Sequence, residues 1–262
     1  MRYSPHALRS CVALALLTLC LAIPPARAGV VIGGTRQIYP AQSREITVQV
    51  TNDDKKFPRL VQAWLDSGDE KMTPEQSDVP FTLTPPAFRV EGGKSQSLRM
   101  VYTKEPLPAD KESVFWLNVL EVPPKLDDGD NQLRFAFRIR TKVFFRPQGL
   151  PGTPQDAVAT LQWSWHKTAQ GSELEVRNPS PYYVSFQDVA LALGSQPDAR
   201  LNRSDQYQMV TPGASQRYLL KDALAALPAG AHVQFSTIND FGGFVPAQAA
   251  LQPAPQLPPV SP

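Results

Sequence analysis

The stretch QLRFAFRIRTKVFFRP, residues 132–147, separates into two faces when alternate positions are read. The first face is apolar apart from Thr141, and holds Leu133, Phe135, Phe137, Ile139, Val143 and Phe145. The second face is mostly polar, with Ala136 and Phe144 as exceptions, and holds Gln132, Arg134, Arg138, Arg140 and Lys142. A period of two, rich in aromatic and β-branched residues and ended by a proline, is typical of a β-strand. Because strands usually run to about 3–10 residues, part of the apolar face is predicted to need cover from elsewhere in the chain or from a partner.

Short extended runs separated by turn residues fill most of the remaining chain. In the first half they are residues 30–32, 35–39, 45–51, 60–65, 81–84, 97–102 and 113–122. In the second half they are residues 159–165, 173–177, 182–193, 207–210, 217–220, 232–238 and 244–249. This spacing predicts an all-β protein made of two immunoglobulin-like β-sandwich domains.

The turn-rich, uncharged segment 148–154 is predicted to be the hinge between the two domains, which we place at residues 29–150 and 151–250. Residues 220–227 have the composition of a helical turn but are too few to change the fold class. The tail, residues 251–262, is rich in proline and is expected to be disordered or polyproline-like.

Residues 1–28 have the pattern of a secretory signal peptide. Arg2 and Arg9 precede an apolar run at residues 11–23, and Ala26 and Ala28 supply the small residues of a cleavage site. The run is shorter than the about 20 residues that a membrane-spanning helix needs. We therefore expect an exported mature chain that is not inserted in the membrane.

Cleavage after Ala28 would change both the charge and the cysteine count. It would remove three arginines, which lowers the formal charge from +2 to −1, so neither nucleic-acid binding nor a polybasic membrane patch is indicated. Both cysteines, Cys11 and Cys20, would leave with the peptide, so no disulfide is expected. His166 and His232 lack the neighbouring motifs of a catalytic triad or a metal site, and no enzyme activity, cofactor or metal is predicted.

Six stretches in order along the mature chain resemble the PapD-like periplasmic pilus chaperones of the chaperone–usher pathway. They are TR at 35–36, PPAFRV at 85–90, FWLNVLEVPP at 115–124, TKVFFRP at 141–147, NPSPYYV at 178–184 and INDFGG at 238–243. The resemblance implies two sandwich domains at an angle about an inter-domain cleft. It also implies a periplasmic chaperone that lends one of its strands to pilus subunits and delivers them to an outer-membrane usher.

The resemblance also assigns roles to individual residues. Arg36 and Lys142 match the two cleft cations that anchor the subunit's C-terminal carboxylate, and such an anchor would fix the strand register. Leu133, Phe135 and Phe137 match the donor residues, and Ile139 fits either the donor set or the domain core. Glu112, Arg146 and Asp240 match an ionic trio that fixes the angle between the domains.

Several alternatives are left open by the sequence. The loop 123–131 is short, as in the branch of the family that serves rod-like adhesive pili. A chaperone for thin capsule-like fibres would have a longer loop. Two alternatives belong to other functional classes. One is an exported adhesive or structural module of tandem sandwich domains, and the other is a secreted hydrolase. The free chaperone is also expected to be able to cover its own donor strand by self-association.

Overall fold

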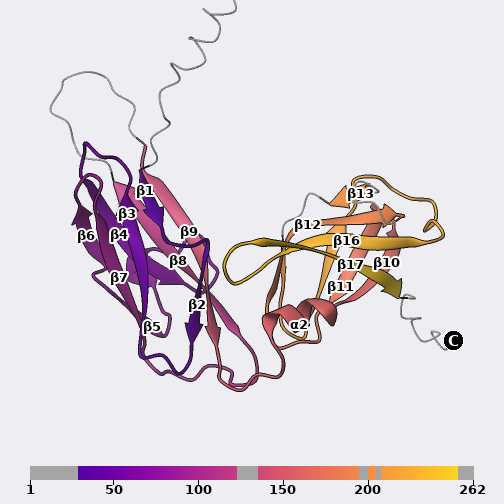
Figure 1. The fold of residues 1–262 in the computed structure, drawn as a ribbon, viewed down its shortest axis with the longest axis horizontal. Helices are drawn as coiled ribbons and strands as arrows, with labels where there is room; N and C mark the ends of the chain where they lie inside the picture. The colour runs from indigo at the N-terminus through magenta and orange to yellow at the C-terminus, as the bar shows by residue number, and fades with distance from the viewer. Residues whose placement is uncertain (1–28, 123–134, 195–199, 205–207, 253–262) are drawn as a thin grey trace, which may run out of the picture.

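The computed structural model of the 262-residue chain describes residues 29–122, 135–194, 200–204 and 208–252, and the expected signal peptide lies outside them. Figure 1 shows two β-sandwich lobes joined by the segment that follows β9. The hairpin between β16 and β17 reaches from the second lobe toward the first (Figure 1). The predicted pair of all-β domains is confirmed.

The first domain packs a four-stranded sheet against a five-stranded sheet. The first sheet has the order β1-β3-β7-β5, and its strands are Val30–Ile32, Ile46–Asn52, Ser95–Tyr102 and Phe81–Thr84. The second has the order β2-β9-β8-β4-β6, and its strands are Arg36–Pro40, Phe137–Arg146, Ser113–Val122, Arg59–Asp66 and Ala87–Val90. A single 3₁₀ turn, η1 at Pro74–Gln76, follows β4. Aromatic rings of Tyr39, Phe81, Phe115 and Phe145 contact one another between the two sheets.

The second domain is an eight-stranded sheet that encloses a second core. Its main path is β13-β12-β16-β17-β10-β11-β15, with strands Arg200–Ser204, Val184–Leu193, Ala231–Ile238, Phe244–Gln252, Gln162–Thr168, Gly171–Arg177 and Ser215–Leu219. The remaining strand, β14 at Met209–Val210, pairs with β12. Trp163 is the largest fully buried side chain, and its ring contacts those of Phe186, Tyr218 and Phe235.

The strand observed within the segment 132–147 is shorter than the alternating pattern of that segment predicts. β9 begins at Phe137, opposite Glu121 on β8, and ends at Arg146. Phe135 and Ala136 lie outside the strand, and residues 132–134 fall outside the described part. The alternation predicts side-chain faces correctly, but a strand extends only as far as its neighbour provides hydrogen-bonding partners, and β8 ends at Val122.

Other boundaries also differ from the predicted ones. The short helix α2, Pro154–Ala159, occupies the end of the predicted hinge and the start of a predicted strand, because Thr153 and Asp156 form a capping box with Pro154 in the first turn. β6 and β13 were not predicted as strands. Residues 220–227 form no helix, and β17 continues to Gln252, past the predicted end of the domain.

Candidate functional site

Two cations expected at a binding site lie opposite each other on neighbouring strands. β2 and β9 run parallel, and their register places Arg36 beside Lys142. Both residues line a cleft of about 460 Å³ between the domains, together with Trp116, Thr141 and Phe244. The two positions are 106 residues apart in sequence, so the parallel pairing of β2 with β9 is what brings the two charges together.

The Arg36 side chain is held on two sides but not fully hydrogen-bonded. Its Nη1 donates to the carbonyl oxygen of Ile238 at 2.8 Å, and its guanidinium carbon lies 5.5 Å from the centre of the Phe144 ring. Its Nε is buried and has no hydrogen-bond partner among the described residues. Burial lowers the pKa of Arg36, although Asp240 and Glu112 act in the opposite direction. The guanidinium therefore retains a donor for an additional acceptor.

Lys142 carries a partly buried ammonium group. No hydrogen bond or ion pair of its Nζ is found within the described ranges. Its pKa is lowered, first by burial and then by the positive charges of Arg36 and Arg140. An anion in the cleft would remove the repulsion between these cations and replace the water that each has lost.

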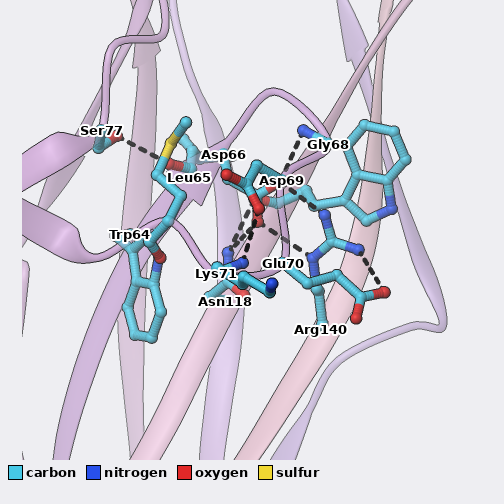
Figure 2. Close-up of polar contacts among 12 residues, drawn as sticks. Trp64, Leu65, Asp66, Gly68, Asp69, Glu70, Lys71, Ser77, Asn118 and Arg140 are labelled. Carbon is cyan, nitrogen blue, oxygen red and sulfur yellow. Dashed lines mark hydrogen bonds and ion pairs between the residues drawn. The ribbon is translucent and has the colours of Figure 1, made fainter.

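Arg140, two positions before Lys142 on the same strand face, is fully engaged in a buried network. Its Nη2 and Nε donate to the two carboxylate oxygens of Asp66 at 2.6 and 3.0 Å, and its guanidinium carbon lies 4.8 Å from the Trp116 ring centre. Asp66 is 1% exposed and also accepts from Asn118 Nδ2 and the Gly68 amide, both at 2.7 Å (Figure 2). Hydrogen bonds from Arg140, Asn118 and Gly68 lower the pKa of Asp66 even though burial raises it.

This network was not predicted from the sequence. The only local signal was an acidic residue, Asp66, directly after the apolar run Ala63–Leu65, and its partner Arg140 lies 74 residues away.

The predicted ionic trio is assembled across the domain interface. Arg146 donates from Nε to Glu112 Oε1 at 2.6 Å, and from Nη1 and Nη2 to the Asp240 carboxylate at 2.7 and 3.0 Å. The second carboxylate oxygen of Glu112 accepts from the Tyr183 amide at 2.8 Å. Burial raises the pKa of Glu112 against the attraction of Arg146, whereas hydrogen bonds to Asp240 and the charge of Glu112 raise the pKa of Arg146 despite its burial. The residue before β8, the end of β9 and the β16–β17 turn are thus tied together at one point.

The residues matched to donor positions differ in burial, with exposed side chains before Ile139 and buried ones after it on the same face. Phe135 and Phe137 are 59% and 60% exposed, and their ring centres are 6.2 Å apart. Ile139 is half-buried and packs against the core of the first domain, while Val143 and Phe145 are buried within it. Leu133 lies outside the described residues. The start of β9 and the residues just before it therefore present large apolar side chains to solvent.

His166 is not part of a catalytic triad. His166 Nε2 lies 2.9 Å from Ser164 Oγ and 3.2 Å from Glu175 Oε2, so one ring nitrogen contacts both groups and no proton relay runs across the ring. Among the described residues no cluster of three or more His, Cys, Asp or Glu side chains could hold a metal ion. None of the helices in the described ranges is long and apolar enough to cross a membrane.

Comparisons with known proteins place the chain in a family. The model of the PapD N-terminal domain, described as a pili and flagellar-assembly chaperone, matches residues 29–151. The model of the PapD pili assembly chaperone C-terminal domain matches residues 156–249. The chaperone protein FimB/FhaD of Bordetella pertussis is 42% identical over 245 residues, which cover 91% of this chain and 95% of that protein.

Solved structures agree with the family models. The crystal structure of the YadV chaperone, named in Escherichia coli as a probable fimbrial chaperone, has a TM-score of 0.71 at 39% identity and covers 86% of this chain and 100% of its own. A chain from the Salmonella enterica SafA pilin–SafB chaperone complex has a TM-score of 0.69 at 28% identity and covers 87% of this chain and 99% of its own. The chain belongs to the PapD-like family of pilus-assembly chaperones, which are not enzymes, and the hydrolase reading is wrong.

Proposed function

We propose that this protein is a periplasmic chaperone that captures pilus subunits by donor-strand complementation and delivers them to an outer-membrane usher. The observation that carries the proposal is the pair of cations Arg36 and Lys142, which lie opposite each other on β2 and β9 and have no ion pair within the described residues. It is joined by the exposed rings of Phe137, at the start of β9, and of Phe135, just before it. Membership of the pilus-chaperone family and the likeness to a chain of a chaperone–pilin complex support the choice of partner. The predicted signal peptide supports the periplasmic location.

The pairing of β9 supports its role as the lent strand. β8 hydrogen-bonds to β9 from Phe137 to Phe145, but β2 pairs with the other edge only from Lys142 to Arg146. Within the described residues, the edge of Phe137–Arg140 that faces away from β8 has no neighbouring strand. A subunit that lacks a strand can pair with this open edge and insert alternate side chains of β9 into its own core.

The two cations would fix the position of that pairing. A terminal carboxylate can accept hydrogen bonds from the Arg36 guanidinium and the Lys142 ammonium at once, each contributing about 1.5–3 kcal/mol. Because strand side chains alternate, a slip of one residue would turn the apolar side chains of the guest to the wrong face. Burial of the two phenylalanines would contribute a further 1.5–3 kcal/mol each, as an order of magnitude.

Capture of a subunit in the periplasm tests the proposal. The chain is co-expressed with a pilus subunit encoded beside it, and the complex is recovered through a tag on the subunit. We expect complex with the wild-type chain and none with Arg36→Ala or Lys142→Ala, while Arg89→Ala, an exposed arginine paired only with Glu91, should behave as wild type. Recovery of normal complex from both cleft variants would refute the anchor.

A further inference from the structure

The second domain contains a cavity that the proposed function does not use. It has a volume of about 430 Å³ and extends from beneath α2 to the domain interface, where Arg36 and Phe144 form part of its wall. β17 pairs with β16 along its whole length to Ala250 but with β10 only at Leu251 and Gln252. The first part of β17 therefore runs free of β10, and α2 helps to enclose the space.

The cavity has the chemistry of a small-molecule site. Much of its wall is apolar, including Val158, Leu161, Phe235 and Val245, and the small side chain of Ala247 leaves it unfilled. Pockets that bind small ligands typically measure about 300–1,000 Å³ and combine an apolar lining with a few polar groups.

Two polar groups of the wall lack hydrogen-bond partners among the described residues, and both can donate: the Arg36 Nε–H, which only donates, and the Ser185 hydroxyl, which can also accept. Ser185 is 3% exposed, and its Oγ has no hydrogen-bond partner among the described residues. The buried Nε of Arg36 likewise has no hydrogen-bond partner among the described residues. Both acids on the wall, Glu112 and Asp240, are already hydrogen-bonded to Arg146. Buried polar groups are nearly always satisfied, so two unpartnered donors beside an apolar cavity indicate an acceptor that enters it.

We propose that this cavity binds a small amphipathic anion of the medium-chain carboxylate class. Its hydrocarbon chain occupies the space beneath α2, and its carboxylate accepts hydrogen bonds at the polar end of the cavity, with Arg36 supplying the charge. The site is distinct from the cleft between β2 and β9, although Arg36 lines both. Binding of such an anion is a property of the free chain and does not depend on the proposed function.

Calorimetric titration of the purified mature chain with sodium octanoate tests the site. We expect saturable binding at one site, with octylamine binding at least tenfold more weakly because its charge is reversed. Ala247→Leu adds three carbon atoms to the wall, narrows the cavity and should weaken the binding. Ala250→Leu is the matched control, since this residue is exposed on the same strand and does not line the cavity. Ser185→Ala and Arg36→Met should each weaken octanoate binding by about tenfold, the effect of one lost hydrogen bond to a charged group.

Two results would overturn the proposal. One is the absence of saturable octanoate binding by the folded wild-type chain. The other is wild-type affinity in a folded Ala247→Leu variant, which would place the octanoate elsewhere, for instance on the exposed rings of Phe135 and Phe137. If Ala247→Leu does not fold, the comparison of octanoate with octylamine, together with Arg36→Met, decides: equal binding of the two amphiphiles that is unaffected by Arg36→Met refutes the site.

Discussion

Lys142→Met should weaken the binding of a carboxylate without weakening the fold, and Arg140→Met should weaken the fold strongly. The two residues are two positions apart on the same face of β9, and both carry a positive charge. Lys142 has no ion-pair partner in the described part of the chain, and burial lowers its pKa, so its charge opposes folding. Arg140 forms two hydrogen bonds to the buried carboxylate of Asp66, so its charge is required there.

The two variants should differ in both the unfolding free energy and the affinity for a carboxylate. Removal of Arg140 leaves Asp66 buried and without its cation, which costs about 3–5 kcal/mol of unfolding free energy. Removal of Lys142 leaves no group unpaired, so the unfolding free energy should stay within about 0.5 kcal/mol of wild type or rise. The loss of one charge-assisted hydrogen bond of about 1.5–3 kcal/mol should weaken carboxylate binding roughly 10- to 150-fold.

Urea denaturation measures the stabilities, and fluorescence anisotropy of a labelled peptide measures the binding. The peptide carries the C-terminal sequence of a pilus subunit encoded beside the chaperone, and its amidated form, which lacks the terminal charge, is the control. The wild-type chain should prefer the free carboxylate, and Lys142→Met should lose most of that preference. A drop in stability of more than about 1 kcal/mol in Lys142→Met, or an unchanged preference for the carboxylate, would refute this reasoning.

Three further predictions concern the same strand and the domain interface. Lys142→Arg should bind the free-carboxylate peptide with little change between neutral and alkaline pH, whereas the wild-type affinity should fall as pH rises through the lowered pKa of Lys142; identical pH profiles would contradict this assignment. Phe137→Ala, at an exposed position, should change the unfolding free energy by less than about 0.5 kcal/mol and reduce subunit capture, whereas Phe145→Ala should cost about 3–5 kcal/mol in urea denaturation, and equal costs would be inconsistent with the burial of the two rings. Glu112→Ala should lower the unfolding free energy by about 2–3 kcal/mol, because Arg146 and the Tyr183 amide both lose an acceptor, and a Tm equal to that of wild type would show that the trio contributes nothing.

Local patterns predicted most of the strands and the two faces of β9, although β6 and β13 were missed. Alternation placed Phe137, Val143 and Phe145 on one apolar face of the strand. In the structure Val143 and Phe145 are buried in the core of the first domain, whereas Phe137 is exposed. The alternation carries no information on where pairing stops, because the end of β9 depends on the length of β8. This is why the predicted strand was too long.

Features that depend on long-range register could not be predicted from composition or period. The adjacency of Arg36 and Lys142 was inferred from a family resemblance and not from their local sequence, in which each is an ordinary strand cation. The ion pair of Arg140 with Asp66 joins residues of two strands that are not neighbours in the sheet, since β8 lies between β4 and β9. By contrast, the capping box at Thr153 was readable locally, and α2 was missed because its proline-rich surroundings indicated a hinge.

The charge distribution around the cleft explains why these two cations in particular are available. Arg140 forms an ion pair with Asp66, and Arg146 forms ion pairs with both Glu112 and Asp240. The charges of these buried or partly buried acids near the cleft are therefore already compensated by arginines. Glu70, the acid that lines the cleft itself, is mostly exposed, and its Oε1 lies 3.5 Å from Arg140 Nη1. Arg36 and Lys142 are left with positive charge that no acid in the described residues offsets by direct contact. The affinity of the cleft for an anion thus depends on the acids as much as on the two cations, because any acid released from its arginine would become a competitor for the site.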